Sequence, residues 1–176
     1  MTRLIPAQWM PATDGLRRIV CHWTAGSYAP SDVDKQHYHF LIAGNGSPHR
    51  GDHSVLDNLS TADDDYAAHT RGCNTGSIGI SVCAMFNARQ SPREWGPYPV
   101  TGEQWNDLLI ACADLCRAYG IKPTPQTLLM HCEVEAFLGI HQNGKWDISV
   151  LPFPLLHGYR TPGEELRGRV AKLLGG

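Results

Sequence analysis

Two histidines and a Lys-x-Asp sequence are the residues whose types and spacing could support catalysis. His22 lies near the end of the apolar run 17–23, and His131 directly follows the apolar residues 128–130. Strand ends at one edge of a sheet form the sites of many α/β proteins. Two imidazoles and a carboxylate such as that of Asp147 form a three-ligand zinc set with a fourth position for water. Each histidine alone also fits a structural role, so the spacing suggests a metal site without establishing one.

The other candidate groups have simple structural interpretations as well. Asp147 could cap a helix or turn, and Lys145 could be a solvated surface charge. Tyr38 could be a core aromatic residue with its hydroxyl at the rim. The remaining histidines, at positions 37, 39, 49, 53, 141 and 157, are interpreted as surface or structural residues.

Strands and helices alternate along the chain, which predicts an α/β fold with a central mixed β-sheet flanked by helices. The clearest helix follows Thr101, which forms a capping box with Gln104, and its apolar residues recur with helical spacing up to position 119. Other helices are expected from 31 or 32 to 36 and over 162–174, and a surface loop over 87–100. Strands are expected over 17–23, 38–42, 77–83 and 127–130, with a hairpin turn at 44–46.

The composition is that of an ordinary globular protein. The 176 residues, 42% hydrophobic and 18% charged, predict one domain over residues 1–176. The formal net charge of -2 gives no general attraction to nucleic acid or to an anionic membrane. Residues 1–10 lack a long apolar run, so neither a signal peptide nor a transmembrane helix is expected, and the protein is expected to be a monomer made in the cytoplasm. The six cysteines are expected to be reduced and mostly buried.

Five blocks of the sequence together resemble a known family. They occur in the order 22–26 (HWTAG), 38–42 (YHFLI), 68–80 (AHTRGCNTGSIGI), 131–134 (HCEV) and 145–147 (KWD). These blocks are similar to successive signatures of the type-2 N-acetylmuramoyl-L-alanine amidases, a group that includes phage lysozymes and peptidoglycan recognition proteins. The resemblance covers about residues 17–150.

The resemblance implies roles for three groups of residues. It implies zinc ligands at His22, His131 and Asp147. It implies catalytic roles for Tyr38 and Lys145, and substrate contacts by Thr24, His69 and Asn74, although His69 could instead make structural hydrogen bonds. Lys145 and Asp147 are two residues apart, so both side chains point to one side of an extended segment, where the ammonium could stabilise an oxyanion beside the metal.

Three features of the sequence depart from the family pattern. Some members have a glutamate general base where Ser81 stands, which leaves proton transfer to water and Tyr38, as in phage-type members. Residues 135–144 form a longer segment than in compact members, and Ile148 replaces a common proline.

The resemblance implies zinc-dependent hydrolysis of the bond between N-acetylmuramic acid and L-alanine. The expected partner is peptidoglycan, both glycan strand and stem peptide, and the expected setting is a phage endolysin that acts on the cell wall after release. A cytoplasmic muropeptide-recycling amidase and a non-catalytic peptidoglycan-binding module are the alternatives. Non-catalytic relatives typically lose a ligand, whereas all three implied ligands are present here.

Overall fold

The centre of the protein is a five-stranded mixed sheet. The structure, a computed structural model, describes residues 3–175. The strands occur in the order β3-β2-β4-β1-β5, and all neighbouring pairs are parallel except β2 and β3. Their bounds are Arg18–Trp23 (β1), Phe40–Ile42 (β2), Pro48–Arg50 (β3), Ser77–Val82 (β4) and Leu128–Met130 (β5). The predicted fold class is confirmed.

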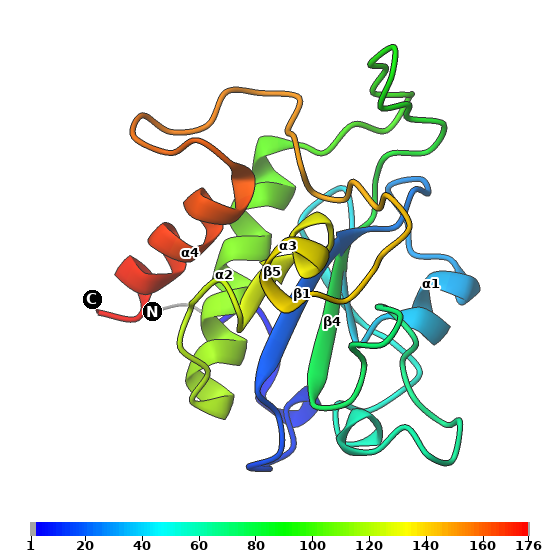
Figure 1. Cartoon of the computed structure of the whole chain (residues 1–176), viewed down its shortest axis with the longest axis vertical. Coiled ribbons are helices and arrows are strands. Elements are labelled where there is room, and N and C mark those ends of the chain that lie inside the picture. Colours follow the sequence, from blue (N-terminus) through cyan, green and yellow to red (C-terminus); the bar gives the residue numbers. More distant parts are fainter. Residues whose placement is uncertain (1–2, 176) are drawn as a thin grey trace.

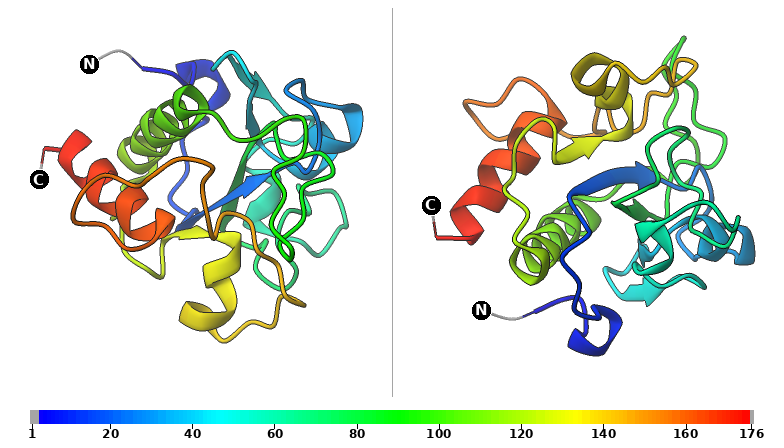
Figure 2. Two further views of the ribbon diagram at one scale, coloured as in Figure 1. Left: turned by 90° about the horizontal axis from the view of Figure 1, so that it is seen from above. Right: turned by 60° about the horizontal axis from the view of Figure 1, so that its bottom comes forward.

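Helices cover both sides of this sheet. They are α1 (Asp32–His37), α2 (Gly102–Tyr119), α3 (Val134–Leu138) and α4 (Pro162–Leu173), with short 3-10 turns at η1 (Ala7–Trp9), η2 (Asp57–Leu59) and η3 (His131–Glu133). Helices α2 and α4 pack against each other on one side of β1, whereas α3 lies on the other side (Figures 1 and 2). Within residues 3–175, no helix combines the length and apolar character needed to cross a membrane.

Alternation along β1 separates a structural face from the face that carries the site. Cys21 points into the main core, where its sulfur lies 3.6 Å from that of Cys112 in α2. Val20 points the other way, into a small cluster with Cys73 and Val134. Because successive side chains of a strand alternate, His22 lies on the same face as Val20, away from α2.

Local signals in the sequence set the ends of the helices. The predicted capping box of α2 is present, with the hydroxyl of Thr101 accepting from the N–H of Gln104, and the helix ends at Gly120, whose φ is 64°. Glycine adopts this left-handed conformation without steric cost. Helix α4 begins in the same way. Its N-cap residue is Thr161, whose side chain accepts the N–H of Glu164.

The second strand is shorter than predicted. It begins at Phe40, and Tyr38 instead ends α1, donating its N–H to the carbonyl of Asp34 at 3.0 Å. The predicted turn after β2 is present, with Gly46 at a φ of 78°, and it leads into β3, which the sequence did not indicate as a strand. The predicted surface loop 87–100 contains no helix or named strand, only a bridge between Arg89 and Glu94.

All six cysteines are free thiols in the structure. Five are buried and Cys132, beside His131, is partly exposed. Burial raises the pKa of the Cys132 thiol to about 12, so it is a neutral thiol at ordinary pH. The prediction that most of the cysteines are buried is confirmed.

Candidate metal centre and its pocket

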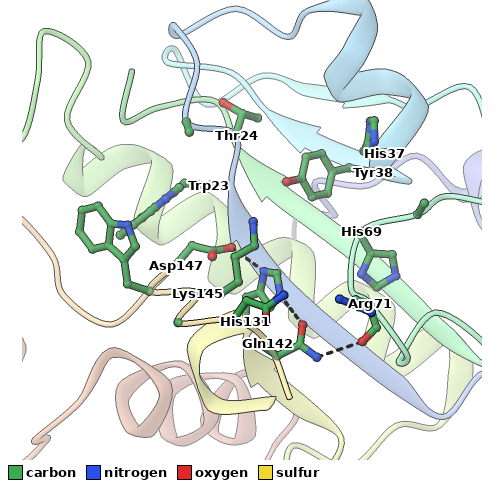
Figure 3. A pocket seen from close by; sticks show the side chains of 15 residues that line it. Trp23, Thr24, His37, Tyr38, His69, Arg71, His131, Gln142, Lys145 and Asp147 are labelled. Carbon is green, nitrogen blue, oxygen red and sulfur yellow. Dashed lines mark hydrogen bonds and ion pairs between the residues drawn. The ribbon is translucent and has the colours of Figure 1, made fainter. Parts of the chain in front are cut away.

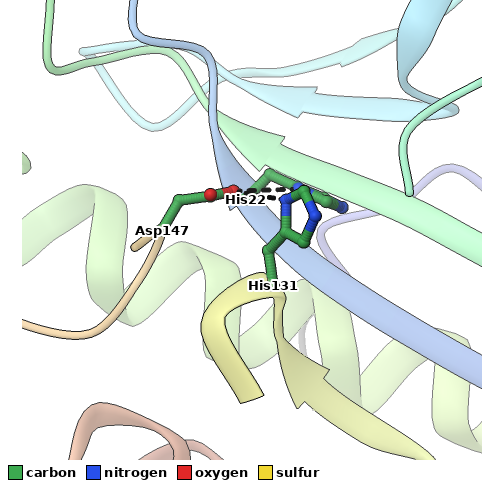
Figure 4. Close-up of side chains that lie close together, drawn as sticks. All are labelled: His22, His131 and Asp147. Atoms are coloured by element: carbon green, nitrogen blue, oxygen red, sulfur yellow. Dashed lines mark hydrogen bonds and ion pairs between the residues drawn. The ribbon is translucent and has the colours of Figure 1, made fainter. Parts of the chain in front are cut away.

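Three side chains from distant parts of the sequence meet beyond the carboxyl ends of β1 and β5. The parallel register pairs Cys21 with Met130, so the next residues, His22 and His131, are neighbours across the sheet. The Nδ1 atoms of His22 and His131 lie 3.0 and 3.1 Å from the same oxygen, Oδ2 of Asp147 (Figure 4). The three predicted ligands therefore lie together, with one donor atom of each within 4.8 Å of the others.

Burial and charge act on this cluster in opposite directions. His22 is fully buried, and this burial lowers its pKa to about 4 despite the hydrogen bond to Asp147. Burial alone would raise the pKa of Asp147, but the close contacts of its carboxylate with His131 and His22 outweigh burial and hold that pKa well below the usual range. At neutral pH the cluster therefore presents a carboxylate and a neutral His22, the protonation states that a metal requires.

The outer nitrogens of both rings have partners of their own. Nε2 of His131 lies 2.9 Å from Oε1 of Gln142, and Nε2 of His22 lies 3.3 Å from both Thr70 Oγ1 and His69 Nδ1. Zinc-binding histidines usually make such outer hydrogen bonds, which leave the inner nitrogen free for the metal. The set of two imidazoles and one carboxylate, supported by these outer hydrogen bonds, fits a catalytic zinc ion.

The turn that carries His131 is fixed to the last helix by a buried ion pair. Arg167 of α4 donates two hydrogen bonds to the carboxylate of Glu133, at 2.7 and 3.0 Å, and a third to the carbonyl of Leu128 in β5. The same carboxylate accepts the N–H of Met130 at 3.0 Å. Helix α4, which lies outside the pocket, thereby holds the end of β5 and the ligand-bearing turn η3 in place.

The cluster lies at the wall of a pocket of about 490 Å³. Predicted residues Thr24, Tyr38, His69 and Lys145 line it together with His131 and Asp147 (Figure 3). The Oγ1 atom of Thr24 also bonds to backbone groups of Ala84 and Gly26, so Thr24 helps to shape the rim. His131 and Asp147 of the cluster thus face the same cavity as Lys145.

Tyr38 lies beside the histidine cluster. Its ring centroid is 5.1 Å from that of His22, and its hydroxyl lies close to Ser81, the residue at the position where some family members have a glutamate. Burial, followed by the negative charge of Asp147, raises the pKa of Tyr38 well above its usual value. The phenol therefore stays protonated and can donate a hydrogen bond to a reacting oxygen.

The other two predicted substrate contacts differ in their placement. His69 lines the pocket but is buried, and its Nδ1 bonds to Thr70 at 2.8 Å; its ring lies so close to Gly79 that any larger residue there would clash. The structure does not bring Asn74 to the pocket wall. Its side-chain oxygen accepts the N–H of Thr70 at 2.8 Å, so it braces the turn that carries His69.

Sequence reasoning missed Gln142, Thr70 and Arg71, which either contact the histidine ligands or line the pocket. Thr70 and Arg71 belong to a block that carried the family resemblance, so their neighbourhood was indicated although their roles were not. Gln142 lies in the segment 135–144, whose unusual length was the only signal available.

Comparisons with known proteins identify the family of this chain. The N-acetylmuramoyl-L-alanine amidase family model matches residues 12–149. The chain belongs to this family, the type-2 amidases. No curated protein matches the sequence.

The solved structures that share the fold include an amidase and a hydrolase. The N-acetylmuramoyl-L-alanine amidase LysC from Clostridium intestinale URNW is 18% identical with a TM-score of 0.50, over 97% of this chain and 93% of that chain. The Staphylococcus aureus hydrolase AmiA, solved with its ligand, is 14% identical with a TM-score of 0.53, over 92% of this chain and 77% of that chain.

Proposed function

We propose that this protein is a zinc-dependent N-acetylmuramoyl-L-alanine amidase. It hydrolyses the amide bond between the lactyl group of N-acetylmuramic acid and the L-alanine of the stem peptide. The observation that carries the proposal is the convergence of His22, His131 and Asp147 at the wall of a pocket that Tyr38 and Lys145 also line. Membership of the amidase family supports the substrate class.

Each side chain of the site has a different chemical role. His22, His131 and Asp147 would hold the zinc ion, which would supply Lewis acidity to polarise the scissile carbonyl and to make water nucleophilic near neutral pH. Lys145 places positive charge where the carbonyl oxygen becomes an oxyanion. The protonated Tyr38 orients a reacting oxygen by donating a hydrogen bond. Ser81 cannot act as a general base, and it lies close to the Tyr38 hydroxyl.

Purified peptidoglycan provides the direct test. Incubation with the protein should lower turbidity and release free N-terminal L-alanine, a chelator should stop both, and added zinc should restore both. His22→Ala should bind no zinc and be inactive, whereas the same change at the exposed His157, outside the pocket, should have no effect. Binding of peptidoglycan without alanine release would instead identify a non-catalytic binding module.

We also propose that this amidase acts as an endolysin of a phage or phage-like element. Support comes from Ser81 at the glutamate position and from the 144–148 sequence, both of which resemble phage-type amidases. Cytoplasmic expression in a bacterium should leave cells intact until the inner membrane is permeabilised, and lysis should then be rapid. Slow or absent lysis together with efficient cleavage of soluble muropeptides would favour a recycling amidase.

A further inference from the structure

We infer, on the basis of the zinc site proposed above, that Gln142 is a positioning residue that fixes the orientation and tautomer of the ligand His131. Gln142 is 5% exposed, and its side chain lies directly behind the His131 ring as seen from Asp147 (Figure 3). Its Oε1 atom is 2.9 Å from Nε2 of His131. Gln142 itself is outside the set of three metal ligands.

The orientation of the Gln142 amide is determined by two backbone carbonyls. Its Nε2 donates to the carbonyl of Arg71 at 2.9 Å and to that of Ile140 at 3.2 Å. Turning the amide over would place its oxygen against two other oxygens and lose both hydrogen bonds. The amide oxygen is therefore the atom that faces His131.

This orientation decides which nitrogen of His131 carries the proton. An amide oxygen can only accept, so Nε2 of His131 must be the donor. The neutral ring then has a lone pair on Nδ1, which points at the Asp147 carboxylate oxygen 3.1 Å away. Two acceptors held this close need a cation between them, and the ring is thus prepared for a metal before the metal arrives.

The other histidine ligand is not constrained in this way. Nε2 of His22 lies 3.3 Å from the hydroxyl of Thr70 and equally far from Nδ1 of His69. A hydroxyl can rotate to donate or accept, and an imidazole nitrogen can do either, so neither neighbour imposes one tautomer. His131 is therefore the ligand whose state is fixed by its surroundings.

The segment that is longer than the family pattern supplies this support. Helix α3 ends at Gly139, whose φ of 69° turns the chain back toward the site. The side chain of Glu135 accepts the N–H of Gln142 at 3.0 Å. This hydrogen bond ties the segment after Gly139 to helix α3. Because Gln142 also binds the Arg71 carbonyl, it connects the inserted segment, the metal ligand and the pocket wall.

Two substitutions separate positioning from a purely structural role. Gln142→Met has a similar volume but replaces the amide oxygen with a weakly accepting thioether, so zinc affinity measured by chelator competition should fall about 10- to 100-fold. Gln142→Glu keeps an acceptor for His131 but loses the bonds to the two carbonyls. It should bind zinc at least as tightly as the wild type while its zinc-free form unfolds at lower urea concentration. Gln126→Met, the same change at an exposed glutamine, should alter neither property.

The negative results distinguish failure of the proposed zinc site from failure of the role given to Gln142. No zinc binding by the wild type would overturn the proposed metal site and this inference with it. Normal zinc affinity in Gln142→Met, or an equal loss in Gln142→Glu, would overturn the inference alone. Nitrogen-15 NMR of the zinc-free wild type in mildly alkaline solution gives an answer that does not depend on any variant folding. The His131 proton should reside on Nε2, and a ring protonated mainly on Nδ1 would contradict the assignment.

Discussion

Oδ2 of Asp147 lies 3.0 Å from Nδ1 of His22, although 125 residues separate the two in the chain. The same oxygen is 3.1 Å from Nδ1 of His131, so one carboxylate oxygen joins the end of β1, the turn after β5 and the segment that follows α3. Removing this carboxylate should therefore abolish the metal site without removing either histidine.

Asp147→Ala should reduce zinc from stoichiometric to negligible amounts and activity to background, as measured by elemental analysis and alanine release. Asp147→Cys should retain zinc, because a thiolate is an equally suitable zinc ligand and some family members carry cysteine at this position. The exposed Asp14 provides a matched control, since Asp14→Ala removes a carboxylate far from the pocket. Stoichiometric zinc in Asp147→Ala would show that this carboxylate is not a ligand.

Lys145→Met should lower kcat about 10²- to 10³-fold with zinc still bound, because the ammonium stabilises developing negative charge and is not a ligand. Steady-state kinetics and zinc content measured on the same preparation check both parts. Lys122→Met, at an exposed lysine outside the pocket, should behave like the wild type. Loss of the metal from Lys145→Met would mean that the lysine has a structural role in the site.

Tyr38→Phe should lower kcat about 10²- to 10⁴-fold, because the reacting oxygen loses a positioned hydrogen-bond donor. Ser81→Ala should have a smaller effect, since it changes a neighbour of the phenol hydroxyl and leaves the hydroxyl itself in place. Zinc affinity should be unchanged in both variants. Equal kcat values for Tyr38→Phe and the wild type would exclude Tyr38 from the reaction.

Stability should fall in mild acid because of His39. Its Nδ1 accepts the N–H of Gly79 at 2.9 Å and its Nε2 bonds to Asn58 at 3.0 Å. Burial lowers the pKa of His39 from 6.5 to about 4, so protonation favours the unfolded chain. The stability that the neutral ring contributes is complete above pH 6.5 and is lost as the pH falls from 6.5 to 4.

The loss assigned to His39 is about 3 kcal/mol, at 1.36 kcal/mol per pKa unit. Urea unfolding of the zinc-free protein should show it as a fall in the free energy of unfolding, added to falls of the same sign from His22 and His69. Nearby His53 opposes protonation of His39 as well. In His39→Gln the dependence on pH should be weaker by about this amount. An unchanged pH dependence would assign the effect to other groups.

Elements with strong local signals were predicted well from the sequence. Helix α2 has long apolar periodicity and a capping box. Strands β1 and β4 consist mostly of apolar and small residues, as buried parallel strands require. Short elements were not predicted. Strand β3 has three residues, one of them Pro48, and α3 has five, too few for a period to show. Their conformations depend on pairing with β2 and on packing against β1.

The sequence by itself determined the family, the fold class and the types of the candidate ligands, because strand-end histidines and motif blocks are local features. Tertiary structure alone decided which side chains meet. It brought Asp147 to His22 and His131, placed Gln142 behind His131, and directed Asn74 to the backbone of Thr70 and away from the pocket. Contacts between residues far apart in the chain follow from sheet register and from the paths of irregular loops, and neither is encoded in any short stretch of sequence.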